Sequence, residues 1–237
     1  MYSFESRVRY SETDQNHRLS VFGMVNYFQD SSTAHTEDAW MTLPELMEKE
    51  GAAWFINFWQ IDINRLPEMG ERITVGTNPH TFRGFVGYRN YFLKSESGEM
   101  LVIANSEWTF VDMHTLSPKR APKNIAEIYG AAEPMEMEYL PRKIKIQGEE
   151  EKTDETVVVR RHMLDMNGHT NNAQYVSAAA DFLPDGFEFD RIRTEYKRAA
   201  QLGETMHVRL YRAPGFFTVS LCDENGGAYA ITEFSKR

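Results

Sequence analysis

The chain has 237 residues, of which 41% are hydrophobic and 26% are charged, and its formal net charge is −9. That length suits one large domain or two small ones, each with enough residues to bury a core. The negative charge argues against a nucleic-acid partner, because phosphate contacts require a basic surface.

The sequence shows no signal for secretion or for a membrane span. No apolar stretch approaches the roughly 20 residues that cross a bilayer, and the N-terminal MYSFESRVRY has no apolar core followed by a small-residue cleavage site. The single cysteine, Cys222, excludes an internal disulfide and fits a reducing compartment. We therefore expect a cytoplasmic protein that does not contact a membrane.

In the first half, the pattern predicts a short strand, then a helix, then four more strands. The short strand lies near residues 7–10, and the helix lies within residues 21–48, where Pro44 interrupts it. The turn SESGE joins the last two of the four strands as a hairpin. These four strands are expected at residues 54–64, 72–80, 85–95 and 99–110.

The second half predicts the same order of elements. Residues 121–153, which precede it, are charged and punctuated by proline, and we expect them to form a linker over the surface. A short strand at residues 156–161 leads into a helix that starts near Asn171 and ends before Pro184. Four strands follow, with the hairpin turn DENGG between the last two, at residues 192–198, 205–212, 216–223 and 228–234.

The two halves also echo each other in sequence. Aligning IDINRLPEMGERITV with TEYKRAAQLGETMHV places Gly70 on Gly203, an offset of 133, and aligning SETDQNHRL with HMLDMNGHT places Asp14 on Asp165, an offset of 151. Two matches in the same order indicate a duplicated unit. A helix followed by four antiparallel strands, present twice, predicts an α+β fold in which each sheet wraps around a central helix.

The most polar stretch of the second half, LDMNGHTNNAQYV at residues 164–176, stands directly before the second helix. One interpretation is a capped helix start, because Asn and Asp side chains accept hydrogen bonds from free backbone amides there. One cap needs one oxygen, however, and each surplus polar group would cost about 1–3 kcal/mol if it were buried without a partner. The five polar groups in question are Asp165, Asn167, His169, Asn171 and Asn172.

The other interpretation of this stretch is an active site. A helix N-terminus presents free amide donors and a partial positive charge, which stabilise an oxyanion that develops from a carbonyl group. An imidazole beside a carboxylate can activate and orient a water molecule. Together these groups suit the hydrolysis of an activated acyl group.

In this context LDMNGHTNNAQYV resembles the acyl-acyl-carrier-protein thioesterases, as do RVRYSETDQNHRLSVFGMVNYFQDSSTAH and ANSEWTFVDMHTLSPKRAP in the first half. The resemblance covers essentially the whole chain. It implies two tandem hotdog units, each an antiparallel sheet wrapped around a central helix, joined by the linker at 121–153. It also implies hydrolysis of fatty acyl-carrier thioesters to free fatty acid, with chain selectivity mainly in residues 1–120 and catalysis in residues 154–237.

Three residues match the catalytic loop of that family by position: Asp165, Asn167 and His169. The resemblance implies that Asn167 and His169 act on the attacking water and the thioester carbonyl, and that Asp165 fixes the loop. No cofactor is implied. A metal hydrolase is not expected either, because the seven histidines show no His-x-x-x-His or His-Glu-x-x-His spacing.

One element of the family pattern is missing. The family strand reads approximately Tyr-Arg-Arg-Glu-Cys, with the acidic residue proposed to take part in catalysis, whereas this chain reads YKRAA and has Ala199 at that position. Alanine cannot move a proton, and the loss of a general base typically costs about 10²–10⁴-fold in rate. Glu195 would share a strand face with Ala199 but lie roughly 10 Å or more away along the strand, so we do not expect it to substitute.

Two other functions therefore stay open. A hotdog hydrolase acting on coenzyme A thioesters would need the same loop, so the loop cannot separate the two substrates. A non-catalytic module that binds an acyl chain or a carrier protein is the second alternative, and Ala199 is the residue that favours it.

Partners are predicted from charge and from the duplication. Arg191, Arg193, Lys197 and Arg198 cluster next to the predicted chemistry in sequence, and we expect some of them to dock the acidic acyl carrier protein. Hotdog units commonly need a partner unit, which the duplication supplies within one chain, so a monomer and a homodimer are both compatible with the sequence.

Aromatic residues are concentrated in the first half, which holds all four tryptophans: Trp40, Trp54, Trp59 and Trp108. Most aromatics at such spacing form core. A subset would suit the wall of a tunnel for an acyl chain, because burial of each methylene contributes roughly 0.8 kcal/mol.

Overall fold

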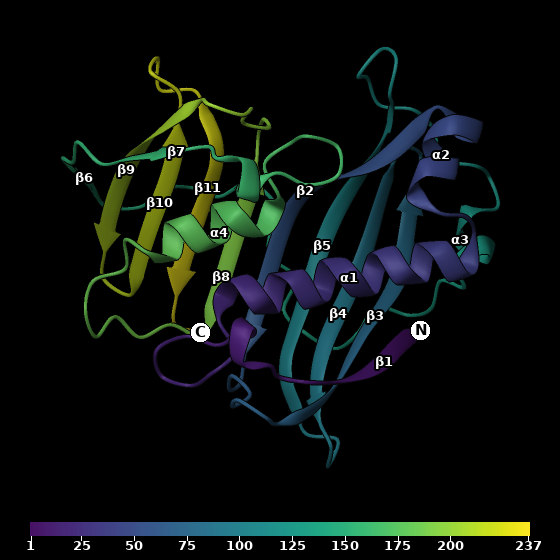
Figure 1. Cartoon of the computed structure of the whole chain (residues 1–237), viewed down its shortest axis with the longest axis horizontal. Helices are drawn as coiled ribbons and strands as arrows, with labels where there is room; N and C mark the ends of the chain where they lie inside the picture. The colour runs from purple at the N-terminus through teal and green to yellow at the C-terminus, as the bar shows by residue number, and fades with distance from the viewer. The chain divides into compact units, whose positions relative to one another are not determined.

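The structure, a computed structural model, describes all residues from 1 to 237. The chain divides into two compact units, of which the first comprises Met1–Asn57 with Ile63–Leu140 and the second comprises Phe58–Asp62 with Pro141–Arg237. In each unit a helix lies across an antiparallel sheet (Figure 1). The predicted α+β class is confirmed.

The sheet of the first unit has the strand order β1-β3-β4-β5-β2. Its central helix α1 packs mainly against β3, and two shorter helices complete the unit. The strands are β1 (Tyr2–Arg7), β2 (Ala52–Ile63), β3 (Arg72–Arg83), β4 (Val86–Ser95) and β5 (Met100–Asp112); the helices are α1 (Val21–Ala39), α2 (Leu43–Glu50) and α3 (Ile125–Ile128).

Local chemistry explains where α1 and α2 begin. The Ser20 hydroxyl accepts a hydrogen bond from the Gly23 amide at 3.0 Å and caps α1. Pro44 was expected to interrupt a single helix, and the structure instead places it in the first turn of α2, where a missing amide hydrogen costs nothing. Thr42 and Glu45 form a capping box at that helix start.

The first strand was predicted at the wrong residues. A strand was expected near residues 7–10, whereas β1 (Tyr2–Arg7) ends there and the chain continues into a 3₁₀ turn at Tyr10–Glu12. Half-buried and exposed side chains alternate along β1, as they do in a strand with one face on the core. β1 pairs only with β3, so it is the edge strand of its unit.

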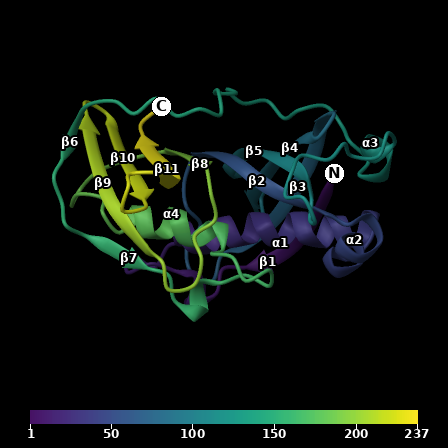
Figure 2. The same ribbon diagram turned by 90° about the horizontal axis from the view of Figure 1, so that it is seen from above.

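The second unit has the strand order β8-β11-β10-β9, with both β6 and β7 paired to β9. The segment Phe58–Asp62 of β2 pairs antiparallel with β8. The central helix α4 packs against β10 and β11 (Figures 1 and 2). The bounds are β6 (Glu149–Glu151), β7 (Thr156–Val158), α4 (Asn172–Ala180), β8 (Arg191–Tyr196), β9 (Thr205–Ala213), β10 (Phe216–Cys222) and β11 (Ala228–Ser235).

The segment predicted as a linker, residues 121–153, holds short elements and is divided between the units. It contains α3 and β6, and the first unit ends within it at Leu140. In the first unit, Asn90 Oδ1 accepts hydrogen bonds from the Met135 amide at 2.9 Å and the Tyr139 hydroxyl at 3.1 Å. Side-chain amides of the sheet therefore fasten this stretch to it.

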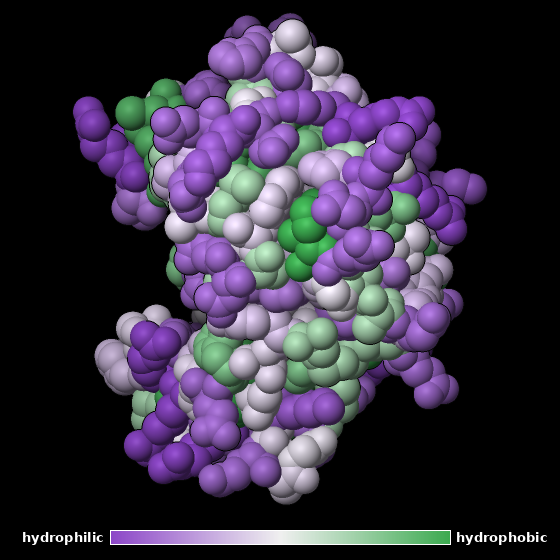
Figure 3. Space-filling model, turned by 90° about the vertical axis from the view of Figure 1, so that its right-hand side faces the viewer, coloured by the Kyte–Doolittle hydropathy of each residue, from purple (hydrophilic) through white to green (hydrophobic).

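None of the helices combines the length and the apolar composition that crossing a membrane would require. The face seen in Figure 3 is mostly hydrophilic, with hydrophobic residues scattered among the charged ones.

Candidate active site

The loop that carries the three predicted residues is closed by its own backbone and by one carboxylate. The Asp165 amide donates to the His169 carbonyl at 2.8 Å, and the Gly168 amide donates to the Asp165 carbonyl at 3.1 Å. Asp165 Oδ1 accepts the amides of Asn167 at 2.8 Å and His169 at 3.0 Å. Gly168 has φ of 75°, a conformation that glycine adopts without strain.

The first unit contains the same loop, offset by 151 residues. Asp14 Oδ1 accepts the amides of Asn16 at 2.8 Å and Arg18 at 3.1 Å, and the Asp14 amide donates to the Arg18 carbonyl at 2.8 Å. His17, at the position of Gly168, also has a positive φ, 61°. The loop shape thus needs an aspartate at its first position and does not need a histidine at its fifth, since Arg18 occupies that place.

The offset of 133 residues also corresponds to repeated geometry. Gly70 and Gly203, 133 residues apart, both have φ of 85°. Glu71 Oε2 accepts the Glu68 amide at 3.0 Å, and Glu204 Oε2 accepts the Gln201 amide at 2.7 Å. Both turns are therefore built in the same way.

Two of the polar side chains before α4 have an identified structural role. Asn171 caps α4 by accepting the Ala173 amide at 2.8 Å, as the capped-helix interpretation predicts. Asp165 is used to close the loop. His169 is half-buried, and the exposed Asn167 side chain makes no hydrogen bond within the protein. The amide and imidazole therefore lie on a loop held by other groups.

Two residues that the sequence analysis missed tie this loop to the strand side of the unit. The buried Thr170 hydroxyl donates to the Ala200 carbonyl at 2.8 Å, and the Ala200 amide donates to the Tyr175 hydroxyl at 2.7 Å. Burial raises the pKa of Tyr175, and the Ala200 hydrogen bond opposes that rise. Tyr175 lies four residues after the helix cap Asn171. Helical spacing therefore places both residues on the same face of α4, and this is the signal in the sequence that could have identified Tyr175.

Paired substitutions separate the structural role of Asp165 from a role in chemistry. We expect Asp165→Ala and Asp14→Ala each to lower the free energy of unfolding by about 1–2 kcal/mol, because each removes the acceptor of two backbone amides. Urea denaturation measures this change, and the corresponding Asp→Asn variants should recover most of it, since an amide oxygen also accepts.

Only Asp165→Ala is expected to lower thioester turnover as well, because only that loop presents His169. The two variants should be equally stable. If Asp165→Ala then kept full turnover, the loop conformation would not be needed for chemistry.

Ala199 is an exposed residue next to the loop. It precedes Ala200, whose carbonyl accepts the Thr170 hydroxyl, and follows Arg198, whose guanidinium pairs with Asp223 at 2.8 Å. β8 ends at Tyr196, so Ala199 is outside the strand that was predicted to continue to residue 198. Ala199, the position at which a family carboxylate was expected, is therefore exposed and lies beyond the end of the strand.

Glu195 lies on the other side of β8 from α4. Tyr196, the next residue, faces α4 and donates from its hydroxyl to the Asn172 carbonyl at 2.9 Å. Glu195 is buried, accepts the Ile144 amide at 3.1 Å and pairs with Lys197. Glu195 is therefore on the strand face opposite α4, and the expectation that it does not act in catalysis stays a prediction.

Two of the four residues of the basic cluster are buried, so the expectation that some of the cluster docks a carrier protein stays a prediction for Lys197 and Arg198 only. Arg191 and Arg193 are buried, at 7% and 9% exposure, and each forms an ion pair with a carboxylate. Arg191 pairs with Asp62, and Arg193 pairs with Glu233. They face the side of β8 that carries Glu195, where the chain from Pro141 onward covers them: Arg193 donates to the Pro141 carbonyl at 2.5 Å.

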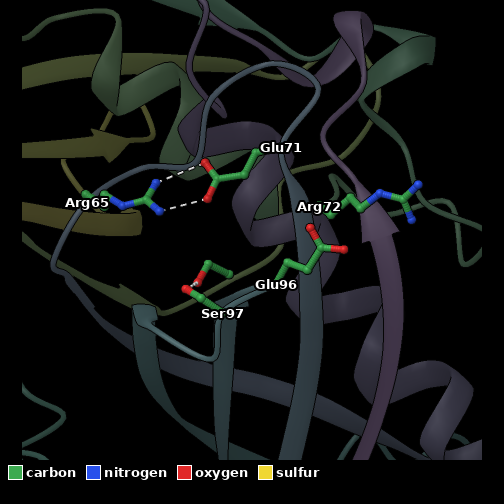
Figure 4. Close-up of a pocket in the computed structure, with 6 residues that line it drawn as sticks. Arg65, Glu71, Arg72, Glu96 and Ser97 are labelled. Atoms are coloured by element: carbon green, nitrogen blue, oxygen red, sulfur yellow. Dashed lines mark hydrogen bonds and ion pairs between the residues drawn. The ribbon is translucent and has the colours of Figure 1, made fainter.

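A pocket of about 460 Å³ in the first unit is separate from these residues. It is lined by Arg65, Glu71, Arg72, Ser95, Glu96 and Ser97 (Figure 4). Arg65 is held there by Glu71 at 2.8 Å and by Glu99 at 2.9 Å. The pocket contains no histidine and none of the predicted catalytic residues. Elsewhere, no group of three or more His, Cys, Asp and Glu side chains is arranged to hold a metal ion.

Family models decide the relationship of the chain. The model of the acyl-ACP thioesterase N-terminal domain matches residues 1–129, and the model of the acyl-ACP thioesterase C-terminal domain matches residues 146–217.

The chain belongs to the acyl-ACP thioesterase family.

Individual members of the family are distant in sequence. A chloroplastic palmitoyl-acyl carrier protein thioesterase of Gossypium hirsutum is 24% identical over 220 residues, which cover 84% of this chain and 52% of that protein. The chain thus spans about half the length of the curated relatives that it matches.

Solved structures of acyl-ACP thioesterases share the fold. The Bacteroides thetaiotaomicron acyl-ACP thioesterase has a TM-score of 0.87 at 18% identity, covering 98% of this chain and 96% of its own. The Umbellularia californica 12:0-ACP thioesterase has a TM-score of 0.79 at 18% identity, covering 99% of this chain and 97% of its own. The predicted double hotdog fold is confirmed.

Proposed function

We propose that this acyl-ACP thioesterase family member hydrolyses fatty acyl-acyl-carrier-protein thioesters and releases free fatty acid. The observation that carries the proposal is the duplicated loop. Both copies keep the aspartate clamp, whereas His169 is present only in the copy that precedes α4. A residue that the loop shape does not require is a candidate for chemistry.

In the proposed reaction, water attacks the thioester carbonyl and the carbon–sulfur bond breaks. His169 accepts the proton of the attacking water and returns it to the leaving thiol sulfur, so the products are a carboxylic acid and a free thiol. Asn167 donates from its side-chain amide to the carbonyl oxygen as negative charge develops there. Asp165 positions both residues through the amides that it accepts.

Substrate choice is divided between the units in this proposal. The second unit, with the His169 loop, carries the chemistry, and the first selects the acyl chain. Carrier recognition is expected to use exposed basic residues such as Lys143 and Lys145 instead of the buried Arg191 and Arg193.

The test is thiol release from a panel of medium- and long-chain acyl thioesters, each presented on acyl carrier protein and on coenzyme A. Turnover that favours the carrier-bound substrates supports the proposal. Preference for coenzyme A would assign the protein to hydrolysis of acyl-CoA. Ala199 favours a third result, in which acyl chains bind without turnover; that result would identify a binding module.

The absent family carboxylate gives a gain-of-function prediction. We expect Ala199→Glu to raise kcat about tenfold or more, because the exposed position admits a carboxylate beside the Thr170–Ala200 contact, where it can accept a proton. Ala199→Gln, equal in size but unable to act as a base at neutral pH, is the control. Equal rates for the two variants and the unchanged protein would mean that no base is missing at this position.

A further inference from the structure

Arg89 is a buried cation in the core of the first unit. It lies on β4 with 8% of its surface exposed. Its Nη1 donates to His35 Nδ1 at 2.9 Å and to the Thr77 hydroxyl at 3.4 Å, and the Tyr129 ring lies 5.2 Å from its Cζ. These contacts come from α1, from β3 and from the residue after α3.

The His35 contact fixes the charge of the imidazole. A guanidinium only donates, so Nδ1 accepts and the ring proton is on Nε2. Burial, and then the nearby Arg89 charge, lower the pKa of His35 to about 4. His35 is therefore neutral and offers Arg89 no counter-charge.

Arg89 differs in this respect from the other buried arginines. Arg191 and Arg193 are buried to the same degree, and each pairs with a carboxylate. No carboxylate contacts Arg89, and burial lowers its pKa, opposed only by Tyr91 and Tyr129. An isolated buried charge is costly unless an anion accompanies it.

Two further buried donors nearby have no acceptor. The Tyr129 hydroxyl, on a residue with 2% exposure, has no hydrogen-bond partner, and neither does Trp54 Nε1. Burial raises the pKa of Tyr129, and the Thr36 side chain, the Arg89 charge and the Trp54 side chain oppose that rise, so Thr36 and Trp54 lie close to the phenol although no hydrogen bond to it meets the distance and angle criteria. The cluster thus offers a positive charge and two buried donors without a partner, and it contains no anionic acceptor.

The surroundings of these donors are aromatic. The Phe82 ring stacks on Tyr129 with centroids 5.9 Å apart, and Trp40 meets Tyr129 edge-on at 6.0 Å. Trp54 packs on Phe110 at 4.9 Å. Apolar walls around a cationic end suit a ligand with an apolar chain and an anionic terminus better than a hydrated inorganic ion.

We propose that Arg89, Tyr129 and Trp54 form a carboxylate-binding site in the first unit, and, resting on the proposed thioesterase function, that its occupant is the far end of a carboxyl-terminated acyl chain. The guanidinium supplies the charge, and the phenol and indole supply neutral donors. The substrate class is then the monothioester of a dicarboxylic acid.

Binding tests this site without requiring turnover. The probes are the monomethyl ester of dodecanedioic acid, which has one free carboxylate, and methyl dodecanoate, which has none. We expect the unchanged protein to bind the first at least about tenfold more tightly in calorimetric titration. Arg89→Met should abolish the preference, and Tyr129→Phe should weaken it about tenfold.

Tyr129→Phe is the decisive variant, because it deletes a hydroxyl that has no partner and should therefore not impair folding. Thr218→Val is its matched control: Thr218 Oγ1 is another buried atom without a partner, and it lies in the second unit. It should leave both affinities unchanged. Equal affinity for the two esters, or a preference that survives both Arg89→Met and Tyr129→Phe, would overturn the site.

Two further experiments distinguish a free anion from a carboxylate on an acyl chain, and distinguish failure of the site from failure of the proposed function. If sodium chloride or sodium acetate alone displaced the carboxylated ester completely at millimolar concentration, the site would hold a small free anion and the acyl-chain assignment would fail. Turnover of both kinds of thioester without preference, unchanged in Arg89→Met, would overturn the inference and leave the proposed function standing. Selective binding that depends on Tyr129, without any turnover, would support the site and reject the proposed function.

Discussion

Replacing His169 with alanine is expected to lower kcat for thioester hydrolysis by about 10²–10⁴-fold, the usual contribution of a general base. The hydrogen bonds that Asp165 makes to residue 169 involve its backbone, so the substitution leaves that clamp in place. Thiol release under single-turnover conditions measures the effect on the chemical step. Thermal unfolding of the variant checks that the fold is retained.

Arg18→Ala is the matched control for this experiment. Arg18 occupies the corresponding position of the first loop, where its amide also donates to an aspartate. Its substitution should leave kcat within about twofold of the unchanged protein, a change too small for the loss of a base. A loss of similar size in both variants would point to a general effect of altering the loops, and His169 would have no special role in chemistry.

Breaking the Arg191–Asp62 ion pair is expected to have the largest effect on stability. Arg191 binds Asp62 through two hydrogen bonds, of 2.7 and 2.9 Å, and the side chains are only 9% and 3% exposed. We expect Asp62→Ala to lower the free energy of unfolding by about 3–5 kcal/mol, because a buried guanidinium loses its carboxylate. At about 2–4 °C per kcal/mol, Tm should fall by about 6–20 °C.

Two comparisons define this result. Arg65→Ala removes an exposed arginine, 40% accessible, that also holds two carboxylates, and it should cost only about 0–1 kcal/mol. The double variant Asp62→Leu/Arg191→Met should recover most of the loss, since apolar pairs of similar volume replace buried ion pairs without penalty. A double variant no more stable than Asp62→Ala would mean that other contacts dominate, such as the one that Arg237 makes to Asp62 at 3.9 Å.

The features that could be predicted from sequence are those that depend on near neighbours. The offset of 151 aligned Asp14 with Asp165, and both loops have the same hydrogen bonds, because an aspartate followed by a positive-φ residue determines the turn locally. The end of α4 before Pro184 follows from the same kind of rule. The catalytic roles of Asn167 and His169 stay predictions.

Features that depend on distant partners were beyond the sequence. Arg191 and Arg193 looked like a solvated basic cluster, and their burial depends on carboxylates that are far away along the chain: Asp62 is 129 residues distant and Glu233 is 40. The exposure of Ala199 depends on the end of β8 at Tyr196, and the alternation of side chains in the sequence did not locate that end. The sequence around Arg89 did not indicate that its charge is buried without a carboxylate. That property depends on three other elements, which contact Arg89 and place no carboxylate against it.

The duplicated aspartate turn separates the conformation of a loop from the side chain that the loop displays. The side chain of Asp165 binds only backbone amides, so the loop conformation does not depend on a particular side chain at position 169. Arg18, at the corresponding position of the first loop, shows that a long cationic side chain is compatible with the same conformation. A saturation library at residue 169 would therefore sample different chemistries on an almost constant support. The same property would have let an ancestral repeat diversify one copy while the other kept the architecture intact.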